Sequence, residues 1–169
     1  MSDKNYRIEI ASENSLIIYF GEQLTDEVAT RVGLAKQLLL DTLGDKLIEL
    51  IPSYASLLVS FDPYRSNQYE IRHLLRQQLT SLLTSGQQHS VSGKLVELPV
   101  YYGEQTGPDL SRIASHSGLT PQQVITLHQQ QEYRVYAIGF APGFGYLGQV
   151  NEKIAMTRLT TPRKLVPKG

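Results

Sequence analysis

The stretch Ala137-Ile138-Gly139-Phe140-Ala141-Pro142-Gly143-Phe144-Gly145-Tyr146-Leu147-Gly148 holds four glycines, one proline and three aromatic residues in twelve positions. Glycine reaches backbone angles that other residues avoid and lets a ligand or another backbone come close. Proline fixes its own φ and pushes the preceding residue toward an extended conformation. The stretch overlaps the end of a strand-like run over 133–138. We therefore expect a shaped loop with apolar walls from Phe140, Phe144 and Tyr146, rather than a simple connector.

A second unusual patch lies closer to the end of the sequence, over residues 158–169. It holds four cations within eleven residues and no acid, namely Arg158, Arg163, Lys164 and Lys168. The planar guanidinium group of arginine suits a carboxylate or a phosphate. On charge pattern alone, an anion-binding edge and a solvated basic tail are equally favoured.

Together the two patches resemble the signature of a known family. Gly139-Phe140-x-Pro142-Gly143-Phe144-x-Tyr146-Leu147, followed by Pro162-Arg163-x-x-Val166-Pro167-x-Gly169, resembles the B subunit of 5-oxoprolinase. That family also includes an inhibitor of a sporulation sensor kinase and the allophanate hydrolase subunit 1-like (carboxyltransferase subdomain C/D) region of urea carboxylase. Ser53-Tyr54-x-Ser56-Leu57-Leu58-Val59 and Gly107-Pro108-Asp109-Leu110 resemble it too, so the likeness extends along the whole chain.

Two expected β-hairpins that alternate with amphipathic helices suggest an α+β fold with a ferredoxin-like domain over 1–92. A truncated cyclophilin-like β-barrel domain with two short helices is expected over 93–169. Thr157-Arg158 stands where the family usually has Pro-Arg, and the family chain continues through a Gly-rich barrel region beyond the turn that ends here at Gly169. A barrel without its later strands leaves unpaired edges. Residues from about 139 onward are then expected to be disordered, to pair with a second copy as a homodimer, or to fold back on the first domain.

The function that the resemblance implies is a non-autonomous subunit of an ATP-dependent 5-oxoprolinase. Such an enzyme opens 5-oxoproline to glutamate together with its C and A subunits, using ATP that this chain alone is not expected to bind. One alternative is a regulatory protein that inhibits a sensor histidine kinase, and another is a carboxyltransferase or allophanate hydrolase subunit 1-like part. Two arginines, Arg158 and Arg163, would hold a substrate carboxylate or a phosphate. The wall of a site shared with a partner would comprise Phe140, Pro142, Gly143, Phe144, Tyr146 and Pro167.

Composition excludes several other classes of function. The chain has 169 residues, of which 41% are hydrophobic and 19% charged, an ordinary globular balance. Sixteen cations balance sixteen acids, so no net charge attracts nucleic acid or an anionic membrane. Cysteine is absent, which excludes disulfides and thiol chemistry. The first residues lack an apolar signal core and no apolar run has membrane-spanning length, so we expect a cytoplasmic protein.

Hydrophobic periodicity predicts two hairpins alternating with two amphipathic helices on one face of a sheet. The expected strands cover 6–11, 16–20, 47–51 and 56–61, and the expected helices run from Thr25 to Gly44 and from Asn67 to near Gly86. A further strand is expected over 94–102, although Pro99 interrupts its hydrogen bonding. Short helices follow, one starting at Asp109 and ending at Gly118, and one from the capping pair Thr120 and Gln123 to about 130.

Other motifs give weaker indications. The segment 110–127 resembles a helix-turn-helix, but no Lys or Arg lies between Leu119 and Glu132 to contact phosphate, so we expect an ordinary helical corner. Gly143-x-Gly145-x-x-Gly148 matches a dinucleotide fingerprint but lacks the acid about twenty residues on. The four histidines show no metal-ligand spacing, and no metal site is expected. His128 is the best candidate for acid–base catalysis because its helix leads into the strand over 133–138.

Overall fold

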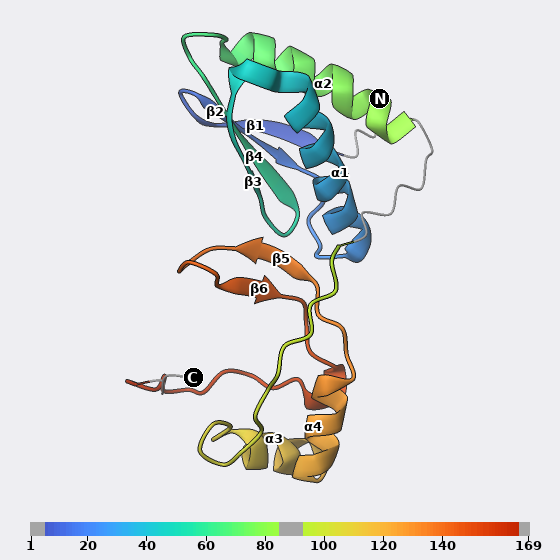
Figure 1. Ribbon diagram of the computed structural model, residues 1–169, viewed down its shortest axis with the longest axis vertical. Helices are drawn as coiled ribbons and strands as arrows, with labels where there is room; N and C mark the ends of the chain where they lie inside the picture. The colour runs from blue at the N-terminus through green and yellow to red at the C-terminus, as the bar shows by residue number, and fades with distance from the viewer. Residues whose placement is uncertain (1–5, 85–92, 166–169) are drawn as a thin grey trace. The chain divides into compact units, whose positions relative to one another are not determined.

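The structure, a computed structural model, describes residues 6–84 and 93–165 and divides into two compact units (Figure 1). The first unit comprises Met1–Gly93 together with Tyr136–Tyr146, and the second comprises Lys94–Val135 and Leu147–Gly169. The hairpin that carries the glycine- and aromatic-rich loop is therefore part of the first unit, although the segments on both sides of it belong to the second. Of the three outcomes expected for the segment from about 139 onward, contact with the first unit is the one seen up to Tyr146.

A four-stranded antiparallel sheet forms the base of the first unit, in the order β1-β2-β4-β3. Its strands are β1 (Arg7–Ser12), β2 (Ser15–Tyr19), β3 (Leu47–Pro52) and β4 (Ser56–Phe61). Ile18 lies opposite both Ile8 and Leu57, and Leu16 lies opposite Val59. Because paired residues share a face of a sheet, this register gathers the apolar side chains on one side. Leu16, Ile18, Leu57 and Val59 are all fully buried there.

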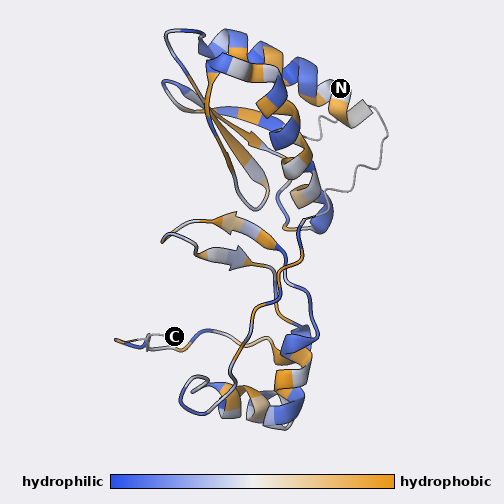
Figure 2. Ribbon diagram, viewed as in Figure 1, coloured by the Kyte–Doolittle hydropathy of each residue, from blue (hydrophilic) through white to orange (hydrophobic). Residues whose placement is uncertain are grey.

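Two amphipathic helices, α1 (Asp26–Leu43) and α2 (Gln68–Thr84), cover that face. Figure 2 shows blue and orange residues interleaved along both helices. The predicted caps are present: the Val28 amide donates to Thr25 Oγ1 at 3.2 Å and the Glu70 amide donates to Asn67 Oδ1 at 3.0 Å. Gly44, with φ 52°, ends α1 and opens the short 3₁₀ helix η1 (Gly44–Lys46). One continuous core joins both helices to the sheet.

The predicted α+β class is confirmed, because helices and antiparallel strands occupy separate layers of the first unit. The order of its elements is strand, strand, helix, strand, strand, helix. This order differs from the β-α-β-β-α-β order of the ferredoxin-like motif, since both helices here follow complete hairpins.

The second unit is built on a helical corner. Helices α3 (Leu110–Ser117) and α4 (Pro121–Gln129) pack with the 3₁₀ helix η2 (Glu152–Ile154) around Ala114, Val124 and Ile154. Gly118 takes the left-handed conformation that the turn requires, with φ 65°. Thr120 and Gln123 form the predicted reciprocal capping box. Neither α1 nor any other helix in the described parts of the chain is both long and apolar enough to cross a membrane.

The strand predicted over 94–102 is not formed. Its apolar side chains are 57–79% exposed, namely Leu95, Val96, Leu98, Val100 and Tyr101. Pro99 has no amide to donate, and no described strand pairs with this segment. Beyond residue 93, the strands in the described part are β5 (Val135–Ile138) and β6 (Gly145–Leu147), which pair only with each other.

Candidate functional site

The loop that joins β5 to β6 is closed by a well-defined turn. The Phe144 amide donates to the carbonyl oxygen of Ala141 at 3.0 Å, with Pro142 and Gly143 at the corner. Gly143 has φ 78°, the angle that the third position of a type II turn requires. A second bond from the Gly139 amide to the Phe144 carbonyl oxygen, 3.1 Å long, closes the base of the loop. Proline and glycine thus occupy the positions where their backbone preferences fit.

Phe140 has an unusual backbone conformation in the same loop. Its φ is 70°, and it is the residue other than glycine with a positive φ in the described parts of the chain. A bulky L-residue in this region is strained by about 1–2 kcal/mol. Phe140 is 89% exposed, and its one ring contact among the described residues is with Phe144 of the same hairpin, so little packing offsets the strain.

Five aromatic rings, all in the first unit, form a continuous ladder. Tyr136 stacks on Tyr54 with ring centroids 5.9 Å apart, and Tyr54 meets the edge of Tyr146 at 6.1 Å. Phe144 meets Tyr146 at 5.1 Å, and Phe140 meets Phe144 at 5.4 Å, both edge to face. These centroid separations and orientations are favourable because each aromatic ring has a negative face and a positive edge. The ladder runs from Tyr136 in β5, by way of Tyr54 in the turn between β3 and β4, out to the exposed tip of the hairpin.

The inner end of the ladder is held by a polar contact. Tyr136 Oη donates to Asp26 Oδ1 at 2.9 Å. Asp26 is the first residue of α1, so its carboxylate also lies at the positive end of that helix. The hairpin is therefore fixed to the sheet by ring contacts at Tyr54 and to α1 by a hydrogen bond.

Arg163, a predicted anion-binding residue, forms an ion pair within the second unit. Its Nη1 and Nη2 donate to Asp109 Oδ2 and Oδ1 at 2.8 and 2.7 Å, a bidentate pair. Arg112 Nε adds a longer contact to the same carboxylate at 3.4 Å. The hydrogen bonds from Arg163 lower the pKa of Asp109, and Asp109 raises the pKa of Arg163. Asp109 was expected to cap α3, but its carboxylate makes no capping bond, and its backbone is αR (φ −96°, ψ −4°) rather than extended.

The other residues of the cationic patch differ from Arg163. Arg158 is exposed, and its guanidinium has no hydrogen-bond or ion-pair partner among the described residues. It therefore remains available to an anion from outside the chain. Pro167, which was also predicted to belong to the site, lies outside the described residues.

His128 lies between two tyrosines of the second unit. Its Nδ1 is 2.7 Å from Tyr102 Oη, and the Tyr133 ring lies 5.3 Å from the imidazole. Tyr133 Oη donates to the backbone oxygen of His128 at 3.0 Å. Burial raises the pKa of the Tyr133 hydroxyl, and the neighbouring Tyr102 adds to that effect. The imidazole is thus oriented through one nitrogen, which is the arrangement that a proton-transferring histidine needs.

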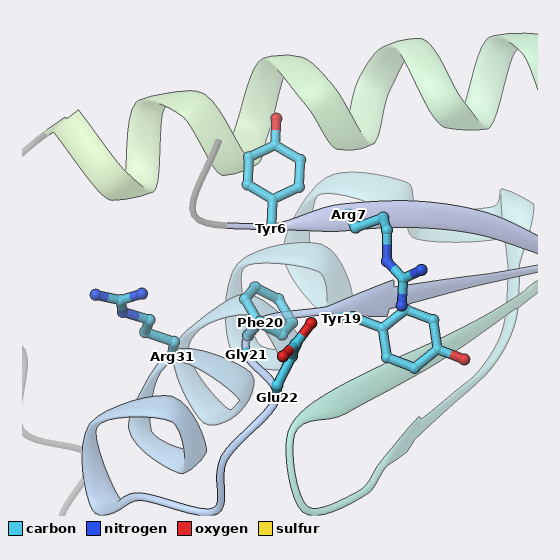
Figure 3. A pocket seen from close by; sticks show the side chains of 7 residues that line it. All are labelled: Tyr6, Arg7, Tyr19, Phe20, Gly21, Glu22 and Arg31. Carbon is cyan, nitrogen blue, oxygen red and sulfur yellow. The ribbon is translucent and has the colours of Figure 1, made fainter. Parts of the chain in front are cut away.

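A separate cavity of about 400 Å³ lies beside the start of β1 and the end of β2. Figure 3 shows Glu22 between Arg31 on one side and Arg7 with Tyr19 on the other. The lining residues are Tyr6, Arg7, Tyr19, Phe20, Gly21, Glu22 and Arg31. Its cations already have partners: Arg7 pairs with Glu9 and Arg31 pairs with Glu27, each at 2.6 Å. These contacts neutralise the two guanidinium groups from within the chain.

The sequence did not reveal two site residues, since Tyr54 was given no role and Asp109 was expected only to cap α3. Tyr54 and Asp109 both lie in short stretches that resemble the family, yet neither stretch contains a pattern that indicates chemistry. The structure brings Tyr54 to the aromatic hairpin and Asp109 to Arg163. Each short stretch therefore contacts one of the two main motif patches.

Within the described residues, no group of three or more His, Cys, Asp or Glu is arranged to hold a metal ion.

Comparison with known proteins finds one family model and several relatives that are named as an enzyme subunit. The family described as carboxyltransferase domain, subdomain C and D, matches residues 6–169. A protein named as the B subunit of 5-oxoprolinase, from Bacillus subtilis (strain 168), is 33% identical over 97% of this chain and 71% of its own length. Its namesake from Escherichia coli O157:H7 is 47% identical over 45% of this chain and 35% of its own length. The chain therefore matches only part of each relative.

Among solved structures, the crystal structure of TTHA0988 in space group P212121 is similar to this chain with a TM-score of 0.74 and 33% identity. The similarity covers 92% of this chain and 30% of TTHA0988. A second crystal form, in space group P6522, gives a TM-score of 0.71 with 32% identity over 91% of this chain and 28% of TTHA0988.

Proposed function

This chain belongs to the carboxyltransferase domain, subdomain C and D, family, and from that premise we propose that it is one subunit of an ATP-dependent 5-oxoprolinase. In this proposal it opens 5-oxoproline to glutamate together with the C and A subunits of that enzyme. The observation that carries the proposal is the alignment of 97% of the chain with the B subunit of 5-oxoprolinase from Bacillus subtilis at 33% identity.

The reaction adds water across the ring amide of 5-oxoproline, which yields a new carboxylate and a free amino group. The substrate carboxylate needs a cation, and Arg158 has a guanidinium free to supply one. Arg163 could contribute after exchange of its partner Asp109 for a substrate carboxylate or a phosphate. In the first unit, the aromatic hairpin presents an apolar wall to a partner subunit. In the second unit, His128 is the proposed proton carrier.

The stretch Gly143-x-Gly145-x-x-Gly148 does not have the geometry of a cradle for the triphosphate of ATP. Gly143-x-Gly145-x-x-Gly148 lies in the hairpin turn, in β6 and just beyond β6, and it does not open a helix. Phosphate cradles place such glycines at the N-terminus of a helix, where amide groups converge. In this proposal the nucleotide therefore binds to one of the partner subunits.

Reconstitution tests the proposal directly. We expect glutamate and ADP to form from 5-oxoproline and ATP only when the purified chain is combined with the A and C subunits. If the A and C subunits formed glutamate equally well without this chain, or if no glutamate formed with all three present, the proposed function would be wrong.

The arginine roles are tested in the same assay. Loss of one charge-assisted hydrogen bond predicts that Arg158→Ala lowers kcat/KM for 5-oxoproline about 10- to 150-fold. Arg76→Ala is the matched control, because Arg76 is an exposed arginine of α2 whose guanidinium has no partner among the described residues. Equal activity of Arg158→Ala and Arg76→Ala would remove Arg158 from the site while leaving the proposed membership of the enzyme intact.

A further inference from the structure

Phe140 combines two features that are unfavourable for the isolated chain. Its backbone has φ 70°, which strains a bulky residue, and its ring is 89% exposed to water. Glycine at this position would relieve both, and the loop already uses glycine at the turn, where Gly143 has φ 78°. Strained residues are concentrated at binding and catalytic sites, where their conformation serves an interaction. We therefore expect the strained, exposed Phe140 to contact another molecule rather than to stabilise this chain.

The ring of Phe140 is not free to move at random. It rests edge to face on Phe144, with centroids 5.4 Å apart, and Phe144 rests on Tyr146 in the same way. The turn at Pro142 and Gly143 and the bond from the Gly139 amide hold the backbone beneath it. An anchor that is already oriented loses little conformational entropy on binding.

The chemistry around Phe140 indicates what kind of surface would receive it. No charged residue occurs between Arg134 and Glu152, so the hairpin tip is uncharged throughout. Ile138 beside it is also exposed, and so is Pro142. A surface without charge is recognised by removal of its apolar groups from water, rather than by an ion pair. An anionic lipid surface is a poorer fit, because interfacial segments normally place cations beside their aromatic residues.

We propose that Phe140 is a preoriented anchor that enters an apolar socket on another polypeptide of the assembly. This inference rests on the proposed function, which supplies the partner. Aromatic anchors surrounded by near-neutral contacts carry much of the affinity of protein interfaces. The ladder behind the ring connects it through Tyr146 to Tyr54, at the turn between β3 and β4, which keeps the anchor in place.

The test measures binding of the purified chain to the C subunit and, separately, to the A subunit, in each case by calorimetry. A hot-spot anchor predicts that Phe140→Ala weakens binding to one of them about 30-fold or more. Phe140→Gly is expected to weaken binding as much, although it relieves the backbone strain, whereas Phe140→Tyr keeps the ring and should stay within a few-fold of the wild type. Tyr64→Ala, which removes another exposed ring of the first unit, is the control and should bind normally.

Two results would overturn the anchor while leaving the proposed function intact. One is wild-type affinity for Phe140→Ala and Phe140→Gly. The other is Phe140-dependent sedimentation with phosphatidylcholine vesicles while the affinity for both partners is unchanged, which would assign the ring to a lipid surface. If the wild-type chain bound neither partner, both the anchor and the proposed function would be wrong.

Discussion

Tyr54 should control how firmly the aromatic hairpin is docked. A two-stranded hairpin is marginally stable by itself in water, so β5 and β6 depend on contacts with the rest of the first unit. Tyr54 supplies two of these contacts, to Tyr136 at 5.9 Å and to Tyr146 at 6.1 Å. Aromatic pairs contribute about 0.5–1.5 kcal/mol each beyond the area that they bury. Tyr54→Ala is therefore expected to lower the free energy of hairpin opening by about 1–3 kcal/mol.

Amide hydrogen exchange reads this opening at two positions in the hairpin. The Gly139 amide is bonded to the Phe144 oxygen, and the Phe144 amide is bonded to the Ala141 oxygen. The expected loss of stability accelerates exchange at both amides roughly 5- to 150-fold. Amides of β4 should exchange at the wild-type rate, because the core beneath them is unchanged.

Two further variants sharpen the measurement. Tyr54→Phe keeps the ring and should exchange like the wild type. Tyr64→Ala removes a tyrosine ring that is 98% exposed, so it should change nothing in the hairpin. Unchanged exchange at Gly139 and Phe144 in Tyr54→Ala would refute the docking role. Equal acceleration throughout β4 would show a general loss of stability instead.

Three other outcomes follow from the fold. Leu57→Ala, at a fully buried position in β4, should lower the free energy of unfolding by about 2–5 kcal/mol, measured by urea denaturation with circular dichroism. Thr120→Ala removes the capping box of α4 and should cost about 1 kcal/mol, whereas Thr120→Ser should retain most of the cap; thermal melts of the two variants decide this. Because Arg163 lowers the pKa of Asp109, the ion pair should persist at neutral pH and weaken only as the pH falls below about 3.9, the usual pKa of aspartate. An NMR titration of the Asp109 carboxyl group in the wild type and in Arg163→Lys checks this.

Local signals in the sequence predicted local structure well. The apolar spacing located α1 and α2, and the caps at Thr25, Asn67 and Thr120 are present as expected. These features depend on residues within about one helical turn of each other. The strand expected over 94–102 failed because a strand also needs a partner, and alternation of apolar residues in one segment does not supply one.

The aromatic residues of the hairpin could be picked out from the sequence, but their contacts could not. Phe140, Phe144 and Tyr146 were identified from composition, and they do lie together on one hairpin. Their contact with Tyr54 joins residues about ninety positions apart, which no local pattern encodes. The strain at Phe140 was also missed. Glycine was expected to take the unusual backbone angles of this loop, but closure of the loop gives one of them to a phenylalanine.

The discontinuous first unit has a consequence for synthesis on the ribosome. Its early part ends at Gly93, but its last piece, Tyr136–Tyr146, is made 146 − 93 = 53 residues later. At translation speeds of about 5–20 residues per second, that gap corresponds to about 3 to 10 s. During this interval the nascent chain presents the Tyr54 ring uncovered, and α3 and α4 emerge before the unit that began first is complete.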